Sequence, residues 1–261
     1  MKQLNSTSLS NLQLTYNFSD GSYGLFLIRY TGVAAAGQTV ALADLGNIIF
    51  NVKGQDKINV PASILSFLDD MYAGAIETVS AIGGAFAFSI IIPCGAWFDK
   101  SNVYNIKKSD EVYFNLTFPN MVAGLIASGT ITLYGKPRNG QTNYIHKILS
   151  RNVVSGGASI VTESITDNNI SEVYLVNPGA LISDLQLTKD GKVIIDGAVG
   201  AELAYSNWIH SLETSGTTLA VEFAESGNVM EALGGGVNYK YTFTGAGTLE
   251  QYFSAIELIR K

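Results

Sequence analysis

Two histidines, His146 and His210, are the only imidazoles in this chain of 261 residues. An imidazole acts as a general base or a metal ligand when a nucleophile, a carboxylate or further histidines lie at suitable spacing. Neither histidine has such a partner at helix or strand spacing, and no His-x-His, His-Glu-x-x-His or Gly-x-Ser-x-Gly motif occurs. We expect surface or linker roles for both, and no cupin-type or serine hydrolase chemistry.

Paired carboxyl groups could perform glycosidase chemistry if both faced one cleft. The candidates are Asp69-Asp70, Asp110-Glu111, and Asp167 with Glu172. Adjacent acids on a helix or strand point to different faces, so we interpret these groups as solvated surface. The oxygen-rich loop 166–172 is a candidate calcium site, but it lacks EF-hand spacing. We therefore expect no resident metal and no cofactor.

Glycine runs and aromatic side chains have structural interpretations. The runs at 83–84 and 234–236 lack the lysine-containing pattern of phosphate-binding loops, so we interpret them as turns between strands. Trp97, Phe98 and Tyr104 could form an exposed sugar-binding patch. Burial under a loop or against a neighbouring subunit is the favoured interpretation, because most aromatic residues pack in cores and interfaces.

The interval 136–158 is basic. Residues 136–157 contain Pro137, three glycines and no acid, and their four cationic side chains are Lys136, Arg138, Lys147 and Arg151. We interpret the interval as a linker between two domains. Its cations are a candidate surface for an acidic partner, lipid headgroups or a neighbouring subunit.

The composition of the whole chain excludes further classes. A net charge of −6 gives no overall electrostatic reason to bind nucleic acid or an anionic membrane. Cys94 is the only cysteine, which excludes intramolecular disulfides and multi-cysteine metal sites. With 47% hydrophobic residues the chain can bury a large core, and its first residues lack the apolar run of a signal peptide.

Strands must position these residues, because apolar and polar side chains alternate with a period of two along much of the sequence. The segments with this pattern are 12–18, 112–118, 185–188, 219–223 and 237–243. Half-buried strands of this kind are typical of antiparallel sandwiches and related folds, not of the buried parallel sheets of nucleotide-binding proteins. The pattern therefore predicts an all-β protein.

Residues 78–98 carry no charge and have about the length of a membrane-spanning helix. The glycines at 83–84 and the alternation of Phe86, Phe88 and Ile90 favour a strand flanked by turns. We predict a strand here and keep a transmembrane helix as the alternative.

Two parts of the sequence share one order of elements. A strand with a lysine–glycine turn comes first, then a short helix, a strand and a closing strand. In the first set, the strand and turn are 48–58, the helix begins at Pro61 and includes Ile64, Leu65, Leu68 and Tyr72, and the two later strands are 85–92 and 129–135. In the second set, the strand and turn are 185–195, the helix includes Tyr205, Trp208, Ile209 and Leu212, and the two later strands are 218–223 and 252–260. This order predicts a duplication, with domains at 1–135 and 159–261 joined by the basic linker 136–158.

The arrangement resembles the double jelly-roll major capsid proteins of tailless icosahedral viruses with an internal membrane, and its length is most similar to the corticovirus type. The segments that carry the resemblance are NVKGQDKINVPASILSFLDD against LTKDGKVIIDGAVGAELAYSNWI, the half-end ITLYGKPRNG and the terminal SAIELIRK. The resemblance implies two tandem eight-stranded jelly-roll β-sandwiches, a double jelly roll, with short helices in connecting loops.

The resemblance also implies a structural function without enzyme activity. Such a chain forms homotrimers with a pseudo-sixfold outline, and these capsomers tile the shell of a virion. Expected partners are the chain itself, neighbouring capsomers, minor capsid proteins and a viral membrane. No direct contact with nucleic acid is expected, because residues 1–20 contain no basic cluster. Lys136, Arg138, Lys147 and Arg151 are then the candidate membrane- or partner-facing surface.

Three alternatives stay open at this point. A tandem β-sandwich that binds carbohydrate would be a monomer whose melting temperature responds to ligand. A virion spike protein would share the virion and occupy another position in it. A two-domain enzyme of the cupin or glycosidase kind would bind metal or show turnover.

Overall fold

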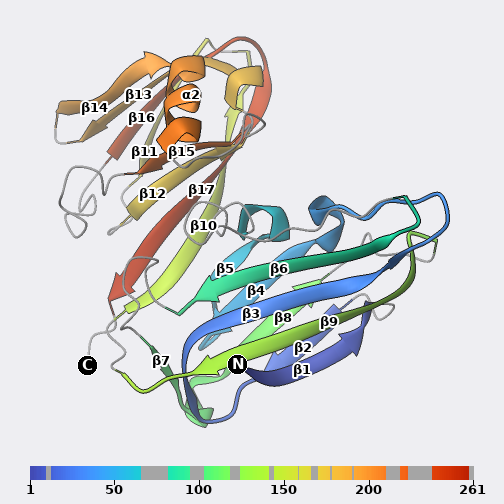
Figure 1. Ribbon diagram of the computed structural model, residues 1–261. Helices are drawn as coiled ribbons and strands as arrows, with labels where there is room; N and C mark the ends of the chain where they lie inside the picture. The colour runs from blue at the N-terminus through green and yellow to red at the C-terminus, as the bar shows by residue number, and fades with distance from the viewer. Residues whose placement is uncertain are drawn as a thin grey trace. The chain divides into compact units, whose positions relative to one another are not determined.

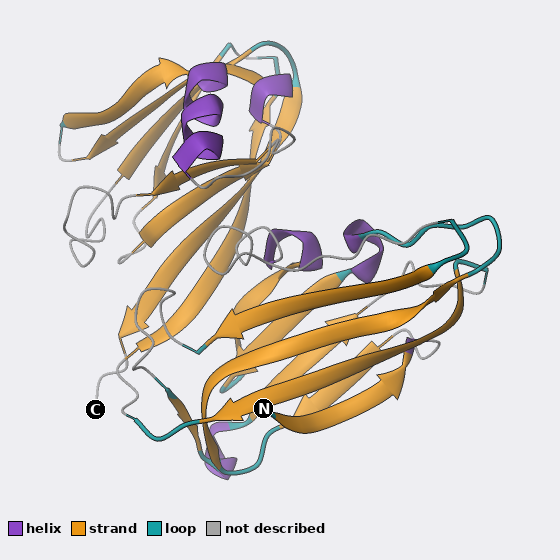
Figure 2. Ribbon diagram, viewed as in Figure 1, coloured by secondary structure: helices purple, strands orange, loops and turns teal. Residues whose placement is uncertain are grey.

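The computed structural model divides into two compact units (Figure 1). The N-terminal unit contains Met1–Lys147 and Glu257–Lys261, and the C-terminal unit contains Ile148–Ile256. Strands predominate in the described part of the chain, and helices are short (Figure 2). The structure describes residues 1–9, 13–65, 82–94, 103–117, 124–140, 144–157, 159–165, 170–176, 178–189, 191–209, 218–222 and 237–258.

The N-terminal unit has two antiparallel sets of strands. The first has the order β1 (Lys2–Ser8), β9 (Ile126–Pro137), β3 (Gly21–Ala34) and β6 (Ala85–Pro93), with β7 (Tyr104–Ile106) also paired to β3. The second has the order β2 (Gln13–Asn17), β8 (Val112–Thr117), β4 (Asn47–Val52) and β5 (Gln55–Pro61). Short 3-10 helices, η2 (Leu42–Leu45) and η3 (Lys108–Asp110), lie in the connections.

Aromatic rings from both sets of strands form the core of this unit. Phe26 of β3 meets Phe114 of β8 edge to face, with ring centroids 5.1 Å apart. The ring centroid of Phe50 in β4 lies 4.7 Å from that of Phe114. In β8 the residues Val112, Phe114 and Leu116 are buried, as the alternating pattern predicts. The two faces of a strand therefore have the separate roles that its sequence indicates.

The lysine–glycine turn joins β4 to β5 as a tight hairpin. Lys53 and Gly54 both have positive φ, at 54° and 77°. Two such residues in succession are typical of a type I′ turn, whose twist matches that of the flanking strands.

The C-terminal unit also has two antiparallel sets of strands. The first has the order β10 (Tyr144–Ser155), β17 (Gly247–Leu258), β12 (Ile170–Val176) and β15 (Thr218–Glu222), of which residues 144–147 and 257–258 belong to the N-terminal unit. The second has the order β11 (Ile160–Ile165), β16 (Val237–Phe243), β13 (Ile182–Lys189) and β14 (Lys192–Ala198). The helix α2 (Val199–Ile209) follows β14 directly, and the 3-10 helix η4 (Pro178–Ala180) precedes β13.

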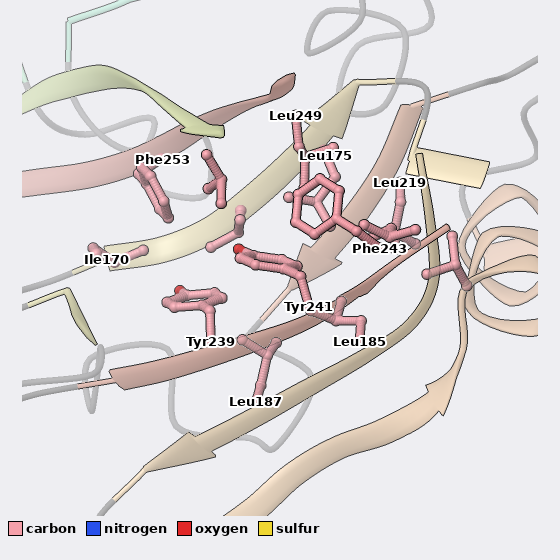
Figure 3. Packing of buried hydrophobic residues seen from close by; sticks show 14 of the residues in the cluster. Ile170, Leu175, Leu185, Leu187, Leu219, Tyr239, Tyr241, Phe243, Leu249 and Phe253 are labelled. Carbon is pink, nitrogen blue, oxygen red and sulfur yellow. The ribbon is translucent and has the colours of Figure 1, made fainter. Parts of the chain in front are cut away.

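Apolar side chains from both sets fill the space between them (Figure 3). Leu185 and Leu187 of β13 are buried with Leu249 and Phe253 of β17. The cluster also includes Val153, Ile170, Val173, Leu175, Ile182, Val199, Leu219, Tyr239, Tyr241, Phe243 and Ala255. The unit is therefore a sandwich with its own core, as a domain requires.

The two units repeat one strand order. The order β1-β9-β3-β6 corresponds to β10-β17-β12-β15, and β2-β8-β4-β5 corresponds to β11-β16-β13-β14. In each unit, the first strand along the chain begins one four-strand order, and the second strand begins the other. Both the predicted duplication and the predicted pair of eight-stranded jelly rolls are confirmed for the described residues.

The basic interval 136–158 differs from the expected linker. Residues 136–137 end β9, and 144–155 form β10. The sequence did not predict strand β10 because its apolar and polar residues do not alternate regularly. Ile145 and His146 are both buried, and basic residues occur among the apolar ones. The boundary between the two compact units falls inside β10, between Lys147 and Ile148. The domain limits 1–135 and 159–261 stay a prediction.

The uncharged segment 78–98 contains a strand where we predict one, because β6 covers Ala85–Pro93. No helix in the described ranges is long and apolar enough to cross a membrane. A helical turn at 62–65 follows β5, with Ile64 and Leu65 buried. The helix α2 includes the predicted Tyr205, Trp208 and Ile209. The other predicted residues of these helices, Leu68, Tyr72 and Leu212, lie outside the described residues.

Candidate functional site

The four predicted basic residues do not all lie in one unit. Lys136 is exposed at the end of β9, and Arg138 is exposed just beyond it. The backbone N–H of Arg138 donates a hydrogen bond to the carbonyl of Ser22, 3.1 Å away, which anchors the chain after β9. Lys147 is partly buried in β10 and belongs to the same unit, whereas Arg151 belongs to the C-terminal unit.

Arg151 takes part in a chain of polar contacts between the two sheets of the C-terminal unit. Its Nε lies 3.4 Å from Oε2 of Glu163. The amide of Gln251 donates to the same carboxylate oxygen at 3.4 Å, and the hydroxyl of Tyr241 donates to Oε1 of Gln251 at 2.7 Å. We call Arg151, Glu163, Gln251 and Tyr241 the inter-sheet polar chain. The charge of Arg151 is thus already balanced within its own unit.

Burial keeps the Tyr241 hydroxyl protonated, so that it can donate. Removal from water raises the pKa of Tyr241 well above its ordinary value, and the neighbouring Tyr239 and Glu163 raise it further. The charge of Arg151 lowers the pKa of Tyr241, but its effect is smaller.

His146 is a core residue, which corrects the expected surface or linker role. Its side chain is 2% exposed in β10. Burial lowers the pKa of His146 to about 4, so the imidazole is neutral at pH 7. The interval looked like a linker because of its basic composition, and this hid the strand that buries the histidine. His210 lies outside the described residues.

Of the predicted acidic residues, Asp110 has described contacts. Asp110 forms an ion pair with Lys53 at 3.2 Å, and it accepts a hydrogen bond from the backbone N–H of Lys107 at 3.1 Å. Asp110 therefore caps the short helix η3. Asp69-Asp70, Asp167 and most of the candidate calcium loop lie outside the described residues. Where side chains are described, no three His, Cys, Asp or Glu residues gather into a metal site.

Tyr104 of the candidate sugar-binding patch is buried in the core and is not part of an exposed patch. Tyr104 packs edge to face against Phe50, with ring centroids 6.2 Å apart, and its burial raises the pKa of its hydroxyl to about 12. Trp97 and Phe98 lie outside the described residues, as does the glycine run 234–236. Gly83 has a φ of 65° in the turn before β6, which agrees with its interpretation as a turn glycine.

Sequence reasoning missed a buried lysine in the N-terminal unit. Lys57 of β5 is 4% exposed, and its Nζ lies 2.6 Å from Oε2 of Glu257. The same Nζ donates to Oε1 of Gln55 at 3.0 Å. Lys57 and Ile58 are buried one after the other, which breaks the alternation in β5. Because its partner is 200 residues away, no local pattern identifies this pair.

Neither the protein-family models nor the curated proteins contain a match to this sequence. Solved structures do. The chain is similar to the major capsid protein of bacteriophage PM2, with 10% identity, a TM-score of 0.68 and coverage of 100% of this chain and 96% of that one. It is similar to the STIV major capsid protein, with 10% identity, a TM-score of 0.69 and coverage of 98% and 96%.

A third similar structure is the PBCV-1 virus capsid protein, with 10% identity, a TM-score of 0.65 and coverage of 97% of this chain and 92% of that one. Likeness at this level of identity establishes the fold. The chain has the double jelly-roll fold of these capsid proteins over nearly its whole length, as the sequence resemblance implies.

Proposed function

We propose that this chain is the major capsid protein of a tailless icosahedral virus and acts in the virion shell as a structural subunit without catalytic activity. The observation that carries the proposal is the repeat of one eight-strand order in both units. Its support is that similar structures covering nearly the whole chain are named as major capsid proteins.

The repeat also suits a homotrimer. Three copies of a chain with two similar units supply six similar bodies, which can pack around an axis with a nearly hexagonal outline. Such capsomers tile a closed surface, with neighbouring capsomers and minor capsid proteins as partners. We propose this assembly for the chain.

The basic residues of the N-terminal unit are the proposed surface for an underlying viral membrane. Lys136 and Arg138 are exposed, and Lys147 is partly exposed. Arg151 contributes less to this attraction, because Glu163 balances its charge. Anionic headgroups attract such cations by about 1 kcal/mol for each one near the surface.

Electron microscopy of the purified chain tests the capsomer proposal. We expect single particles with a hexagonal outline and a threefold axis. Isolated monomers at all protein concentrations would contradict it. Carbohydrate binding is not favoured as a second function, because Tyr104 of the candidate patch is buried.

Flotation with lipid vesicles tests the basic surface. The variant with Lys136, Arg138 and Lys147 changed to Glu should lose binding to anionic vesicles and keep its assembly state. A matched control changes the exposed Lys53, Lys107 and Lys240 to Glu, which alters the net charge equally. If the two variants bind the vesicles equally, the assignment of this surface is wrong.

A further inference from the structure

The sequence contains a single Asn-Gly dipeptide, Asn139-Gly140, which lies just beyond the end of β9. Strand β9 is paired with β3 up to Pro137. The backbone N–H of Arg138 then donates to the carbonyl of Ser22. Asn139 and Gly140 are both exposed, and neither forms a hydrogen bond with another described residue. Described contacts therefore fix the backbone as far as Arg138 and not at the dipeptide.

An asparagine that is followed by glycine can modify itself. Once the backbone N–H of Gly140 gives its proton to hydroxide, the nitrogen attacks Cγ of Asn139. A C–N bond forms, ammonia leaves, and a cyclic succinimide remains. Water then adds to either ring carbonyl and leaves an aspartate or its β-linked isomer. The net reaction consumes water, releases ammonia and replaces an amide with a carboxylate, without an oxidant or a reductant.

Ring closure has two structural requirements, and Asn139 meets both. The nitrogen of the following residue must approach Cγ, so the backbone must be able to rotate. A side chain on the following residue obstructs this approach, and glycine has none. Asn152 is also exposed, but it lies inside strand β10 and is followed by the β-branched, buried Val153. The fold therefore protects Asn152 and leaves Asn139 open to the reaction.

The reaction at Asn139 places its new charge at the proposed basic surface, because Asn139 directly follows Arg138. The interval 136–157 contains four cationic side chains and no acid. A carboxylate at position 139 is ionised at pH 7, so it lowers the net charge of this interval from +4 to +3. Attraction to anionic headgroups weakens with each unit of positive charge that is lost.

We propose that Asn139-Gly140 is a self-modifying site, at which loss of ammonia places a negative charge beside Arg138 and weakens binding of the chain to an anionic membrane. The modification follows from the exposed dipeptide, whereas its effect on lipid binding rests on the proposed function of Lys136 and Arg138. The released ammonia is lost to solvent, so the modified fraction grows with the age of the protein.

Peptide mapping by mass spectrometry tests the modification in the folded, full-length chain after incubation at neutral and mildly alkaline pH. We expect aspartate and its β-linked isomer at position 139, formed faster at the higher pH because hydroxide removes the proton. Asn152 should react more slowly by about tenfold or more, and Gly140→Ala should slow the reaction at Asn139 by about the same factor. If Asn139 reacts no faster than Asn152, the site is overturned.

Flotation with vesicles that contain phosphatidylserine tests the effect on binding. Asn139→Asp carries the charge of the product, and Asn139→Gln keeps a neutral amide. We expect about fivefold weaker binding for Asn139→Asp and unchanged binding for Asn139→Gln. Asn152→Asp is the matched control, because it alters the net charge equally next to Arg151, whose charge Glu163 already balances. This control should bind as the wild-type chain does.

The outcomes separate this inference from the proposed function. Suppose that Asn139→Asp binds as tightly as the wild-type chain, while the variant with Lys136, Arg138 and Lys147 changed to Glu loses binding. The effect of the new charge is then overturned, and the basic surface stands. If position 139 is modified as expected but the wild-type chain binds no anionic vesicles, the membrane surface and the effect on binding are both overturned, and the modification site stands.

Discussion

Tyr239 and Tyr241 lie stacked in the core of the C-terminal unit, with ring centroids 6.2 Å apart and ring planes 17° apart (Figure 3). Both are almost completely buried, but only one hydroxyl has a described partner. Tyr241 donates to Gln251, whereas the Tyr239 hydroxyl makes no hydrogen bond with any described residue. A buried hydroxyl contributes to stability when it is bonded and costs free energy when it is not.

The two tyrosines give a matched pair of substitutions. Tyr241→Phe should lower the free energy of unfolding by about 1–3 kcal/mol, because Gln251 is left buried with an unused acceptor. Tyr239→Phe should leave the free energy of unfolding unchanged or raise it slightly. Urea denaturation followed by circular dichroism measures both. Equal losses from the two substitutions would show that the inter-sheet polar chain does not stabilise the unit.

His146 makes stability depend on pH through its burial. Its pKa is lowered to about 4 in the folded chain, against 6.5 for a free imidazole. Between these values the unfolded state binds more protons than the folded state, so stability rises with pH. The stability that comes from keeping His146 neutral is retained above pH 6.5 and is lost progressively as the pH falls towards 4. The loss below pH 4 amounts to about 3 kcal/mol.

The variant His146→Gln removes this titration and keeps a polar side chain. We compare the free energies of unfolding of the wild-type chain and the variant. The wild-type value minus the variant value should be constant above pH 7 and should fall as the pH is lowered from 6.5 to 4. The subtraction cancels the carboxyl groups, which titrate in both proteins. Parallel curves for the two proteins would show that His146 is not buried as a neutral group.

The sequence predicted the residues of the core better than the polar groups within it. Phe114, Leu116 and Tyr241 follow from alternation alone, because burial of every second residue leaves a periodic pattern. Glu163 and Gln251 are 88 residues apart, and only the packing of two sheets brings them together. Their contact therefore leaves no local signal.

At the scale of elements, β3 and β9 approach each other closely at Gly32. A Cβ atom added there would lie 2.8 Å from Cα of Gly129, nearer than real Cβ atoms lie to other atoms, and it would also overlap the carbonyl of Ser128. Strand β3 pairs with β9 on one side and with β6 on the other, so neither backbone can easily shift.

Gly32→Ala should therefore destabilise the N-terminal unit by about 1–3 kcal/mol. Gly156→Ala is the control, because a Cβ there would meet nothing within 4 Å. Thermal unfolding should show a clear fall in melting temperature for Gly32→Ala alone. A melting temperature equal to that of the control would mean that the strands are not in this register.

Strands with one buried face were predictable, and strands without a clean alternation were not. The segment 237–243 becomes β16, as its pattern indicates. Strand β3 escaped prediction because Leu25-Phe-Leu-Ile is a continuous apolar run and two bulges break its register. A short apolar run does not distinguish strand from helix by period. Strand β10 escaped because its basic residues suggested a linker.

At the scale of the whole molecule, the duplication was predictable because hairpin turns mark it. The lysine–glycine segments at 48–58 and 185–195 become the hairpins β4–β5 and β13–β14. Which strands pair was not predictable, because partners such as β3 and β9 are far apart in the sequence and no local pattern identifies them.

The mass of the purified chain in solution tests the capsid assignment most directly. Light scattering coupled to size exclusion should give three times the 27.9 kDa of the single chain, at both high and low protein concentration. The repeated strand order predicts this closed trimer. A mass of 27.9 kDa at every concentration would contradict the assignment.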